Sequence, residues 1–270
     1  MKPKKSLGQH FLKSQKVVQK IIETAGVSQE DTVLEVGPGR GALTKALLER
    51  AGKVIAVEKD RELKPFLEKL FQKELKNGTL ELVFGDILDN TKTLPSCEGK
   101  AFAEYKIVAN IPYYITGQFL RKFLSIENQP KSITILIQKE VALRIARDKK
   151  ESILSISVKA YGTPKYIQTV KAREFSPAPN VDSAILHISR ISKDFFHLLD
   201  IGCPTSEKEE GFFRLIRTGF LHKRKFLARN LEEIAKKDAI ASAFLVCNIP
   251  KNTRAEDVLL EKWMCLLRNI

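Results

Sequence analysis

Apolar and polar positions in the first half of the chain form two alternating patterns. Short apolar runs typical of buried strands are separated by stretches in which apolar residues recur every three or four positions, as on one face of a helix. This alternation indicates an α/β fold with a parallel sheet covered on both faces, in which ligands bind beyond the carboxyl ends of the strands. The predicted strands are 32–36, 53–57, 80–84, 105–109 and 132–138, and the predicted helices are 17–25, 42–50, 61–76 and 118–124.

The pattern changes at about residue 191. From there the apolar residues follow helical spacing, and Gly202, Pro204 and Pro250 separate the stretches. The predicted helices of this part are 212–220, 223–235 and 255–267. We therefore predict an α/β domain over residues 1–190, with a basic N-terminal arm, and a small helical domain over residues 191–270.

The net charge of the chain and its distribution predict a binding partner. The formal net charge is +14 and the sequence pI is about 9.6. Residues 1–20 contain six lysines and no acid, and residues 212–230 contain six basic residues and no acid. Because a polyanion gains affinity from each counterion that a basic side chain displaces, these acid-free blocks predict contact with nucleic acid.

Two classes of protein are disfavoured. No stretch approaches the roughly 18 consecutive apolar residues of a membrane span, and the first residues lack the apolar centre of a secretory signal. The four cysteines, Cys97, Cys203, Cys247 and Cys265, form no C-x-x-C pair and have no nearby histidine pattern. We expect a cytoplasmic protein without membrane contact, with reduced thiols and no metal.

A glycine-rich loop follows the first predicted strand. Gly37, Gly39 and Gly41 lie between a strand and a helix, where glycine lets the backbone turn sharply and approach a nucleotide closely. Glu58 ends the next strand 19 residues beyond Gly39, which suits a carboxylate that accepts hydrogen bonds from ribose hydroxyls. Asp86, after the third strand, is placed to accept from an adenine amino group, although a turn-forming Asp would look the same.

The identity of the nucleotide follows from the glycine spacing. Dinucleotide-binding loops carry G-x-G-x-x-G, whereas the third glycine here comes one residue earlier. S-adenosylmethionine is therefore favoured over NAD. Taken alone, the loop could also be an ordinary turn between a strand and a helix.

The tetrapeptide Asn110-Ile111-Pro112-Tyr113 predicts methyl transfer to an amino group of adenine. This amine is a poor nucleophile because its lone pair is delocalised into the ring, and two acceptors aimed at its N–H bonds draw the lone pair out of conjugation. Asn110 supplies a side-chain carbonyl, and Pro112 can leave its own backbone carbonyl or that of Ile111 unpaired. The displacement at a sulfonium then needs positioning and electrostatics more than a metal or a strong base.

Two neighbouring tyrosines receive different predictions. Tyr113 is predicted to stack on the target base, which must leave any helical stack to reach the cosubstrate. Tyr114 and Ile115 are predicted to pack against the sheet. The alternative for the whole motif is a proline turn that closes the strand and buries two aromatic rings.

With these motifs in order, the sequence resembles the ribosomal RNA adenine N6,N6-dimethyltransferases, and among them the bacterial small-subunit enzymes. The resemblance spans most of residues 5–190. Its blocks are 7–12 (LGQHFL), 34–41 (LEVGPGRG), 57–58 (VE), 85–88 (GDIL), 110–114 (NIPYY), 138–142 (QKEVA) and 175–183 (FSPAPNVDS).

The resemblance implies a Rossmann-like S-adenosylmethionine methyltransferase domain followed by a small C-terminal helical domain that contacts RNA. It also implies that Phe175 presses on the target adenine beside Tyr113, although a buried aromatic before a rigid turn is an equal alternative. The helical tail would contribute Arg224 and Lys225 to RNA binding. The implied cosubstrate-binding residues are His10, Leu12, Gly37, Gly39, Glu58, Asp86, Ile87 and Asn110.

The substrate that the resemblance implies is a pair of adjacent adenosines in the hairpin loop near the 3′ end of small-subunit ribosomal RNA, each methylated twice. We expect a monomer that acts on a 30S assembly intermediate during ribosome biogenesis. Two alternatives stay open. One is the large-subunit dimethylase that confers macrolide resistance, and the other is a non-catalytic assembly or transcription factor on the same fold.

Overall fold

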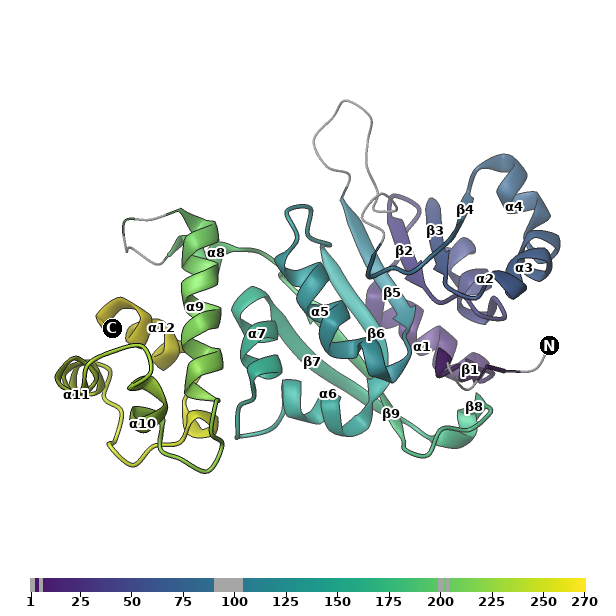
Figure 1. Cartoon of the computed structure of the whole chain (residues 1–270). Coiled ribbons are helices and arrows are strands. Elements are labelled where there is room, and N and C mark those ends of the chain that lie inside the picture. Colours follow the sequence, from purple (N-terminus) through teal and green to yellow (C-terminus); the bar gives the residue numbers. More distant parts are fainter. Residues whose placement is uncertain (1–2, 5–6, 90–103, 199–201, 203) are drawn as a thin grey trace. The chain divides into compact units, whose positions relative to one another are not determined.

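The computed structural model describes residues 3–4, 7–89, 104–198, 202 and 204–270 (Figure 1). Contacts divide the chain into two compact units. The first comprises Met1–Ala142 and Pro164–Ile191, and the second comprises Leu143–Thr163 and Ser192–Ile270. Each unit has its own core and is described by itself.

A seven-stranded sheet forms the centre of the first unit, with the order β4-β3-β2-β5-β6-β9-β7 (Figure 1). The five strands from β4 to β6 are parallel, whereas β9 pairs antiparallel with β6. A separate antiparallel pair joins β1 to β8. The strands are β1 (Phe11–Leu12), β2 (Thr32–Val36), β3 (Lys53–Glu58), β4 (Leu80–Phe84), β5 (Tyr105–Asn110), β6 (Ser132–Gln138), β7 (Thr163–Val170), β8 (Phe175–Ser176) and β9 (Ser183–Ser189).

The predicted parallel α/β sheet is confirmed for these five strands, whereas β7 and β9 were not predicted and β9 adds an antiparallel strand beside β6. Apolar spacing marks a strand but carries no information on its direction, so the pattern could not indicate that a strand beside β6 runs antiparallel. Central positions on both faces are buried: Val33 and Val108 point to the face that helix α1 covers, while Leu34 and Ile107 on the opposite face are also fully buried. The near-continuous apolar runs reflect this double cover.

Helices cover the sheet with the amphipathic spacing that their sequences show. In α1 (Gln15–Ala25) the buried residues are Val17, Val18, Ile21, Ile22 and Ala25, and Gly26 ends the helix in the left-handed conformation. The remaining helices of this unit are α2 (Ala42–Leu48), α3 (Lys64–Leu70), α4 (Gln72–Asn77) and α5 (Thr116–Ser125), with 3₁₀ turns at Arg61–Leu63, Tyr113–Ile115 and Ala172–Glu174. Helix α6 (Lys139–Ala146) follows β6.

The single helix predicted over 61–76 is divided. A 3₁₀ turn begins it, and α3 and α4 are separated at Phe71, whose φ and ψ are −114° and 30°. The Phe71 side chain is buried, and its ring lies so close to Gly41 that an added Cβ there would be 2.7 Å from it. Packing of Phe71 under the glycine loop therefore accounts for the break.

The second unit is helical. Its core includes Trp263, which is fully buried and donates from Nε1 to the carbonyl of Val258. Gly219 at the end of α9 admits this indole, since a Cβ at Gly219 would be 2.3 Å from the ring. The helices are α7 (Ile153–Tyr161), α8 (Asp194–His197), α9 (Thr205–Gly219), α10 (Leu227–Leu231), α11 (Lys237–Val246) and α12 (Leu260–Asn269), with a 3₁₀ turn at Ala255–Asp257.

The predicted helices of this part shift in the structure. The stretch 212–220 corresponds to the end of the longer α9, which stops at Gly219, and 223–235 comprises an exposed turn, the short α10 and a second turn. Helix α11, in which Ile240, Ala243 and Phe244 are buried, was not predicted. Leu143–Thr163, which the sequence assigns to the first domain, groups with the helical unit. The functional division into domains 1–190 and 191–270 stays a prediction.

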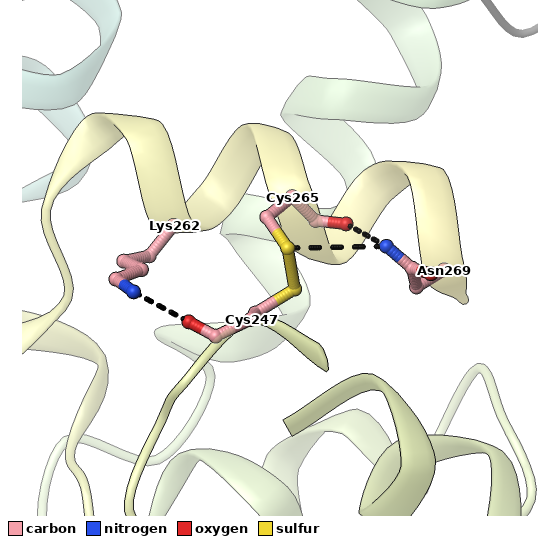
Figure 2. The surroundings of a disulfide bond; sticks show 4 residues. All are labelled: Cys247, Lys262, Cys265 and Asn269. Atoms are coloured by element: carbon pink, nitrogen blue, oxygen red, sulfur yellow. Dashed lines mark hydrogen bonds between the residues drawn. A yellow bond between two sulfur atoms is a disulfide. The ribbon is translucent and has the colours of Figure 1, made fainter. Parts of the chain in front are cut away.

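The expectation of reduced thiols is wrong for two cysteines. Cys247, after α11, and Cys265, within α12, form a disulfide with a Cα–Cα distance of 5.6 Å (Figure 2). Lys262 of α12 donates to the Cys247 carbonyl and so adds a polar contact between the two ends, while Asn269 donates to the Cys265 carbonyl within α12 (Figure 2). Their spacing carries no signal because the two cysteines are 18 residues apart and only the packing of α11 on α12 brings them together. Cys97 and Cys203 lie outside the described residues.

Candidate active site

A pocket opens where the strand order reverses. From β2 the chain proceeds to β3 and β4 on one side, and then to β5 and β6 on the other. The carboxyl ends of β2, β3 and β5 contribute Val36, Glu58 and Asn110 to the pocket wall, and residues 7–12 and 85–87 complete it. Parallel sheets bind ligands at such a point because neighbouring loops diverge there and leave a crevice.

The glycine loop lines this pocket in a conformation that favours glycine. Gly37, Gly39 and Gly41 have φ values of 74°, 56° and 78°. A Cβ at Gly39 would also be 2.9 Å from the ring of Phe11. The guanidinium of Arg40 lies 4.7 Å from the centroid of that ring. Phe11 and Arg40 thus cover the loop, and sequence reasoning missed them because the contact joins the N-terminal arm to the loop.

Glu58 connects the loop to the end of β3. Its side chain is 6% exposed; Oε2 accepts from the Gly39 N–H at 3.0 Å and Oε1 accepts from the Asp60 N–H at 2.8 Å. Burial raises the pKa of Glu58, although these backbone hydrogen bonds oppose the rise. Each carboxylate oxygen can accept more than one hydrogen bond, so Glu58 retains capacity for a ligand hydroxyl.

Asp60 holds the N-terminal arm beside the loop. Its oxygens accept from Lys4 Nζ and from Gln9 Nε2, each at 2.8 Å. Burial alone would raise the pKa of Asp60, but the hydrogen bonds from Lys4 and Gln9 outweigh burial and hold the pKa below its ordinary value. Sequence reasoning assigned no role to Asp60, and the only signal was its position two residues after Glu58.

Asp86 follows β4 and is already engaged. Lys59 Nζ donates to Oδ2 at 2.6 Å, and the N–H of Leu88 donates to Oδ1 at 2.9 Å. Burial by itself would raise the pKa of Asp86, but the bonds from Lys59 and Leu88 outweigh it and lower the pKa. Ile87 beside it is buried and lines the pocket. A ligand amino group would share this carboxylate with Lys59 or displace it.

Asn110 ends β5 with its amide in a defined orientation. Nδ2 donates to the carbonyl of His10 at 3.0 Å. The side-chain carbonyl at the other end of the amide makes no hydrogen bond with the described residues. The Pro112 carbonyl accepts from the Ile115 N–H at 3.2 Å, whereas the Ile111 carbonyl has no such partner in the described part of the chain. Two acceptors, Asn110 Oδ1 and the Ile111 carbonyl, are therefore available next to each other.

Tyr113 is fixed by contacts on two sides. Its hydroxyl hydrogen-bonds with Ser183 Oγ at 2.6 Å, and its ring stacks with His10 at a centroid distance of 6.0 Å and an interplanar angle of 21°. His10 in turn donates from Nδ1 to the carbonyl of Pro177 at 2.8 Å. Burial raises the pKa of Tyr113, so its hydroxyl stays protonated at neutral pH. Ser183 and Pro177 had no role in the sequence-based prediction.

The prediction for Tyr114 is wrong, whereas Ile115 is buried as predicted. Tyr114 is 58% exposed at the wall of the pocket and does not pack against the sheet. A 3₁₀ turn at Tyr113–Ile115 is the physical reason. Three residues complete one turn of such a helix, so successive side chains point in three different directions and only two of them reach the protein interior.

Several residues predicted to contact the substrate or the cosubstrate are either buried or part of the second unit. Phe175 is 1% exposed and belongs to the main hydrophobic core, as does Leu12, its partner in the β1–β8 pair. In this conformation the Phe175 ring does not face the open pocket. Arg224 and Lys225 lie in the second unit, in the exposed turn before α10.

Neither a metal cluster nor a membrane span is present among the described residues. No group of three or more His, Cys, Asp or Glu side chains in this part of the chain could hold a metal ion. None of its helices combines the length and apolar character needed to cross a membrane.

Comparison with known families identifies the chain. A family model for "Ribosomal RNA adenine dimethylase" matches residues 1–269. The chain belongs to this family. It is 40% identical to the ribosomal RNA small subunit methyltransferase A of Dehalococcoides mccartyi strain CBDB1, over 98% of this chain and 88% of the relative. It is 35% identical to the protein of the same name from Fusobacterium nucleatum, over 99% of this chain and 97% of the relative.

Solved structures agree on the fold. A dimethyladenosine transferase from Plasmodium falciparum superposes with a TM-score of 0.76 at 24% identity, covering 95% of this chain and 96% of the other. The 23S rRNA methyltransferase ErmE superposes with a TM-score of 0.73 at 23% identity, covering 96% and 98%. The predicted Rossmann-like methyltransferase fold with a helical C-terminal region is confirmed, and so is the predicted class of enzyme.

A ribosomal RNA adenine dimethylase uses S-adenosylmethionine, and the residues of the pocket fit this cosubstrate. Its ribose carries hydroxyl donors and its adenine carries an amino donor, which match the carboxylates of Glu58 and Asp86. The glycine loop offers a backbone surface with no Cβ at Gly37 or Gly39 to obstruct the ligand. When bound, this group supplies an electrophilic methyl on a sulfonium, and the protein has to orient an acceptor toward it.

Proposed function

We propose that this ribosomal RNA adenine dimethylase transfers methyl groups from S-adenosylmethionine to the N6 atoms of two adjacent adenosines. The adenosines lie in the 3′-terminal hairpin loop of small-subunit ribosomal RNA, and each is methylated twice during ribosome biogenesis. The enzyme acts as a cytoplasmic monomer on a 30S assembly intermediate. Two relatives with 40% and 35% identity, each described as a small-subunit methyltransferase, support this substrate over the large-subunit alternative.

One observation carries the proposal. The bond from Asn110 Nδ2 to the His10 carbonyl turns Asn110 Oδ1 away as an acceptor, and the Ile111 carbonyl is a second acceptor beside it. Two acceptors from neighbouring residues suit the two N–H bonds of an exocyclic amine. As both accept, the nitrogen approaches tetrahedral geometry and its lone pair becomes free to attack the methyl carbon.

The chemistry needs few further groups. The nitrogen–carbon bond forms as the carbon–sulfur bond breaks, and the electron pair of that bond stays on sulfur. The attacking amine then carries a positive charge, which Asn110 Oδ1 and the Ile111 carbonyl stabilise until its proton leaves to water. Tyr113, fixed by Ser183 and His10, stacks on the flipped base and holds its amine in line with the methyl group.

The remaining predicted residues take supporting roles. Glu58 accepts from the ribose hydroxyls, Asp86 with Ile87 holds the adenine of the cosubstrate, and Gly37 and Gly39 allow close approach. His10 and Leu12 enclose the cosubstrate from the N-terminal arm, which Asp60 anchors. Phe175 would reach the target base only after the pair β1–β8 shifts, because its ring is buried.

The helical domain at 191–270 is proposed to contact RNA. Arg224 and Lys225 lie in an exposed turn, and Asn230 supports this turn by donating from Nδ2 to the carbonyls of Gly219 and His222. A supported turn holds its basic side chains at a defined place, so it suits phosphate contacts better than a freely moving tail would.

The test is methyl transfer to defined particles. The purified protein and methyl-labelled S-adenosylmethionine are incubated with unmethylated 30S particles, 50S particles, naked small-subunit RNA and DNA, and the products are digested to nucleosides. We expect N6,N6-dimethyladenosine from 30S particles alone or above all others. Label confined to 50S particles would replace the substrate by the large-subunit alternative. Absence of label with intact cosubstrate binding would support the non-catalytic factor.

A further inference from the structure

An aromatic side chain at the pocket has no function in the proposed reaction. Tyr114 is 58% exposed, which makes it the most exposed aromatic residue in the described part of the chain; Phe226 and Phe66 follow at 43% and 36%. Tyr114 lines the same pocket as Asn110 and Tyr113. An exposed ring at this place is unusual because aromatic side chains generally contribute to stability by burial.

The local backbone holds the ring in this position. In the 3₁₀ turn Tyr113–Ile115, Tyr113 is half-buried and bonded to Ser183 of β9, and Ile115 is 8% exposed, so the positions of these two side chains are fixed. Thr116 Oγ1 donates to the Tyr113 carbonyl and supports the turn. The third direction of the turn is the outward one, and Tyr114 occupies it.

The N-terminal arm supports the ring from one side. A Cβ added at Gly8 would be 3.5 Å from both Cδ1 and Cε1 of Tyr114, and Gly8 has a φ of 60°. The Tyr114 hydroxyl makes no hydrogen bond with any described residue. The ring is therefore not part of the core, although its side chain interacts electrostatically with Lys59. It is a supported aromatic surface with more than half of its area open to solvent.

We propose that Tyr114 stacks on the RNA base next to the target adenosine. This inference rests on the proposed function, because it requires an unpaired RNA strand at the pocket. A base that enters the pocket leaves its neighbour without a stacking partner on that side. An aromatic ring at the pocket wall replaces this partner and holds the strand while the target base is inside. Base stacking on aromatic rings tolerates any base, so Tyr114 positions the strand without reading its sequence.

Three single variants separate the ring from the other properties of the side chain. Tyr114→Phe keeps the ring and removes the hydroxyl, whereas Tyr114→Leu keeps an apolar side chain and removes the aromatic face. Phe66→Leu is the matched control, since Phe66 is an exposed aromatic on α3 that does not line the pocket. Thermal unfolding of each variant verifies the fold, and cosubstrate affinity is measured for each.

The first measurement is the steady-state kinetics of methylation of unmethylated 30S particles. We expect Tyr114→Leu to raise KM for the particle about tenfold, the loss typical of one stacked base. Tyr114→Phe and Phe66→Leu stay within about twofold of the parent, and the cosubstrate affinity of all three is unchanged. Equal loss in Tyr114→Phe would assign the effect to the hydroxyl and overturn the proposal, as would an unchanged KM in Tyr114→Leu.

The second measurement identifies the contact as a base. A hairpin RNA with the target adenosine is compared with the same RNA in which the nucleotide next to this adenosine is abasic. The measurement is made at low salt, where phosphate contacts keep both RNAs bound. The abasic RNA should bind the parent protein about tenfold more weakly and should bind Tyr114→Leu as well as the intact RNA does. Additive losses would overturn the proposal. A raised KM for 30S particles in Tyr114→Leu without any loss of hairpin binding would also overturn it, and would point to a ribosomal protein as the partner of Tyr114. Failure of the parent protein to methylate any particle would instead contradict the proposed function.

Discussion

Asn110 combines two tasks in one amide group. Its nitrogen fixes the loop that carries His10, and its oxygen is left as an acceptor at the end of β5. We expect Asn110→Ala to lower the methylation rate at least ~100-fold, the loss typical of one preorganised polar group at a reacting centre. RNA binding should remain within a few-fold. Nucleoside analysis and RNA titration measure the two effects.

A control for Asn110→Ala is Asn77→Ala. Asn77 lies at the end of α4, where its side chain accepts from the Thr79 N–H and hydroxyl away from the pocket. This change should leave methylation unaffected. Normal turnover by Asn110→Ala would contradict the acceptor mechanism.

Glu35 is a buried acid beneath the glycine loop. It is 1% exposed, and neither carboxyl oxygen makes a well-formed hydrogen bond with the described residues. Burial raises its pKa to about 8; the neighbouring Thr44 hydroxyl opposes the rise and the charge of Glu58 adds to it. The unfolded chain ionises this group near its ordinary pKa of 4.5, so between these two values the folded protein binds the additional proton.

Stability should therefore fall as the pH rises through this window. Each unit of pKa shift corresponds to ~1.4 kcal/mol, so the loss attributable to Glu35 is on the order of a few kcal/mol between pH 5 and pH 8. Glu35→Gln should remove this part of the pH dependence, as measured by urea unfolding at pH 5, 6.5 and 8. Parallel stability curves for the parent and Glu35→Gln would show that Glu35 is ionised in the folded protein.

Among the elements, the loop between β2 and α2 depends on glycine for both conformation and space. Gly39 has a φ of 56°, and a Cβ there would be 2.9 Å from Phe11. We expect Gly39→Ala to weaken cosubstrate binding at least ~10-fold, because Phe11 and the loop must move apart. Calorimetric titration of the cosubstrate measures the change.

Gly78→Ala is the matched control for this prediction. Gly78 ends α4 with a φ of 79° and has nothing within 4 Å of an added Cβ. Both substitutions place alanine in the left-handed region, at ~1–2 kcal/mol of strain. Only Gly39→Ala should change cosubstrate affinity. Equal binding losses in both variants would assign the effect to general destabilisation.

Across the chain as a whole, the positive charge is unevenly distributed. The exposed turn before α10 is the basic segment whose position is best defined by hydrogen bonds. Reversing Arg224 and Lys225 to Glu should weaken RNA binding and lower the slope of log K against log salt by ~1 for each phosphate that is no longer neutralised. Reversing Lys73 and Lys76, which are exposed on α4 of the first unit, changes the net charge equally. An equal change of slope in both double variants would show that net charge, and not the turn, determines binding.

Much of the site was predictable because its residues are adjacent in sequence to strand ends. Gly37, Glu58, Asp86 and Asn110 each follow or end an apolar run, and the carboxyl ends of neighbouring parallel strands meet at one edge of the sheet. The apolar spacing likewise placed the five parallel strands to within a residue or two. These features depend on the local pattern of apolar and polar residues, which can be read directly from the sequence.

Contacts between distant segments emerge only when the chain has folded. The placement of Phe11 over Gly39, the anchoring of Lys4 on Asp60 and the bond from Tyr113 to Ser183 join segments between about 28 and 70 residues apart. The spacing of residues along the chain does not indicate such pairs, because they form only when the helices and strands pack together. The same holds for the disulfide between Cys247 and Cys265, the antiparallel direction of β9, and the outward Tyr114. Residue order specifies which elements and motifs exist, and packing selects which side chains face the pocket.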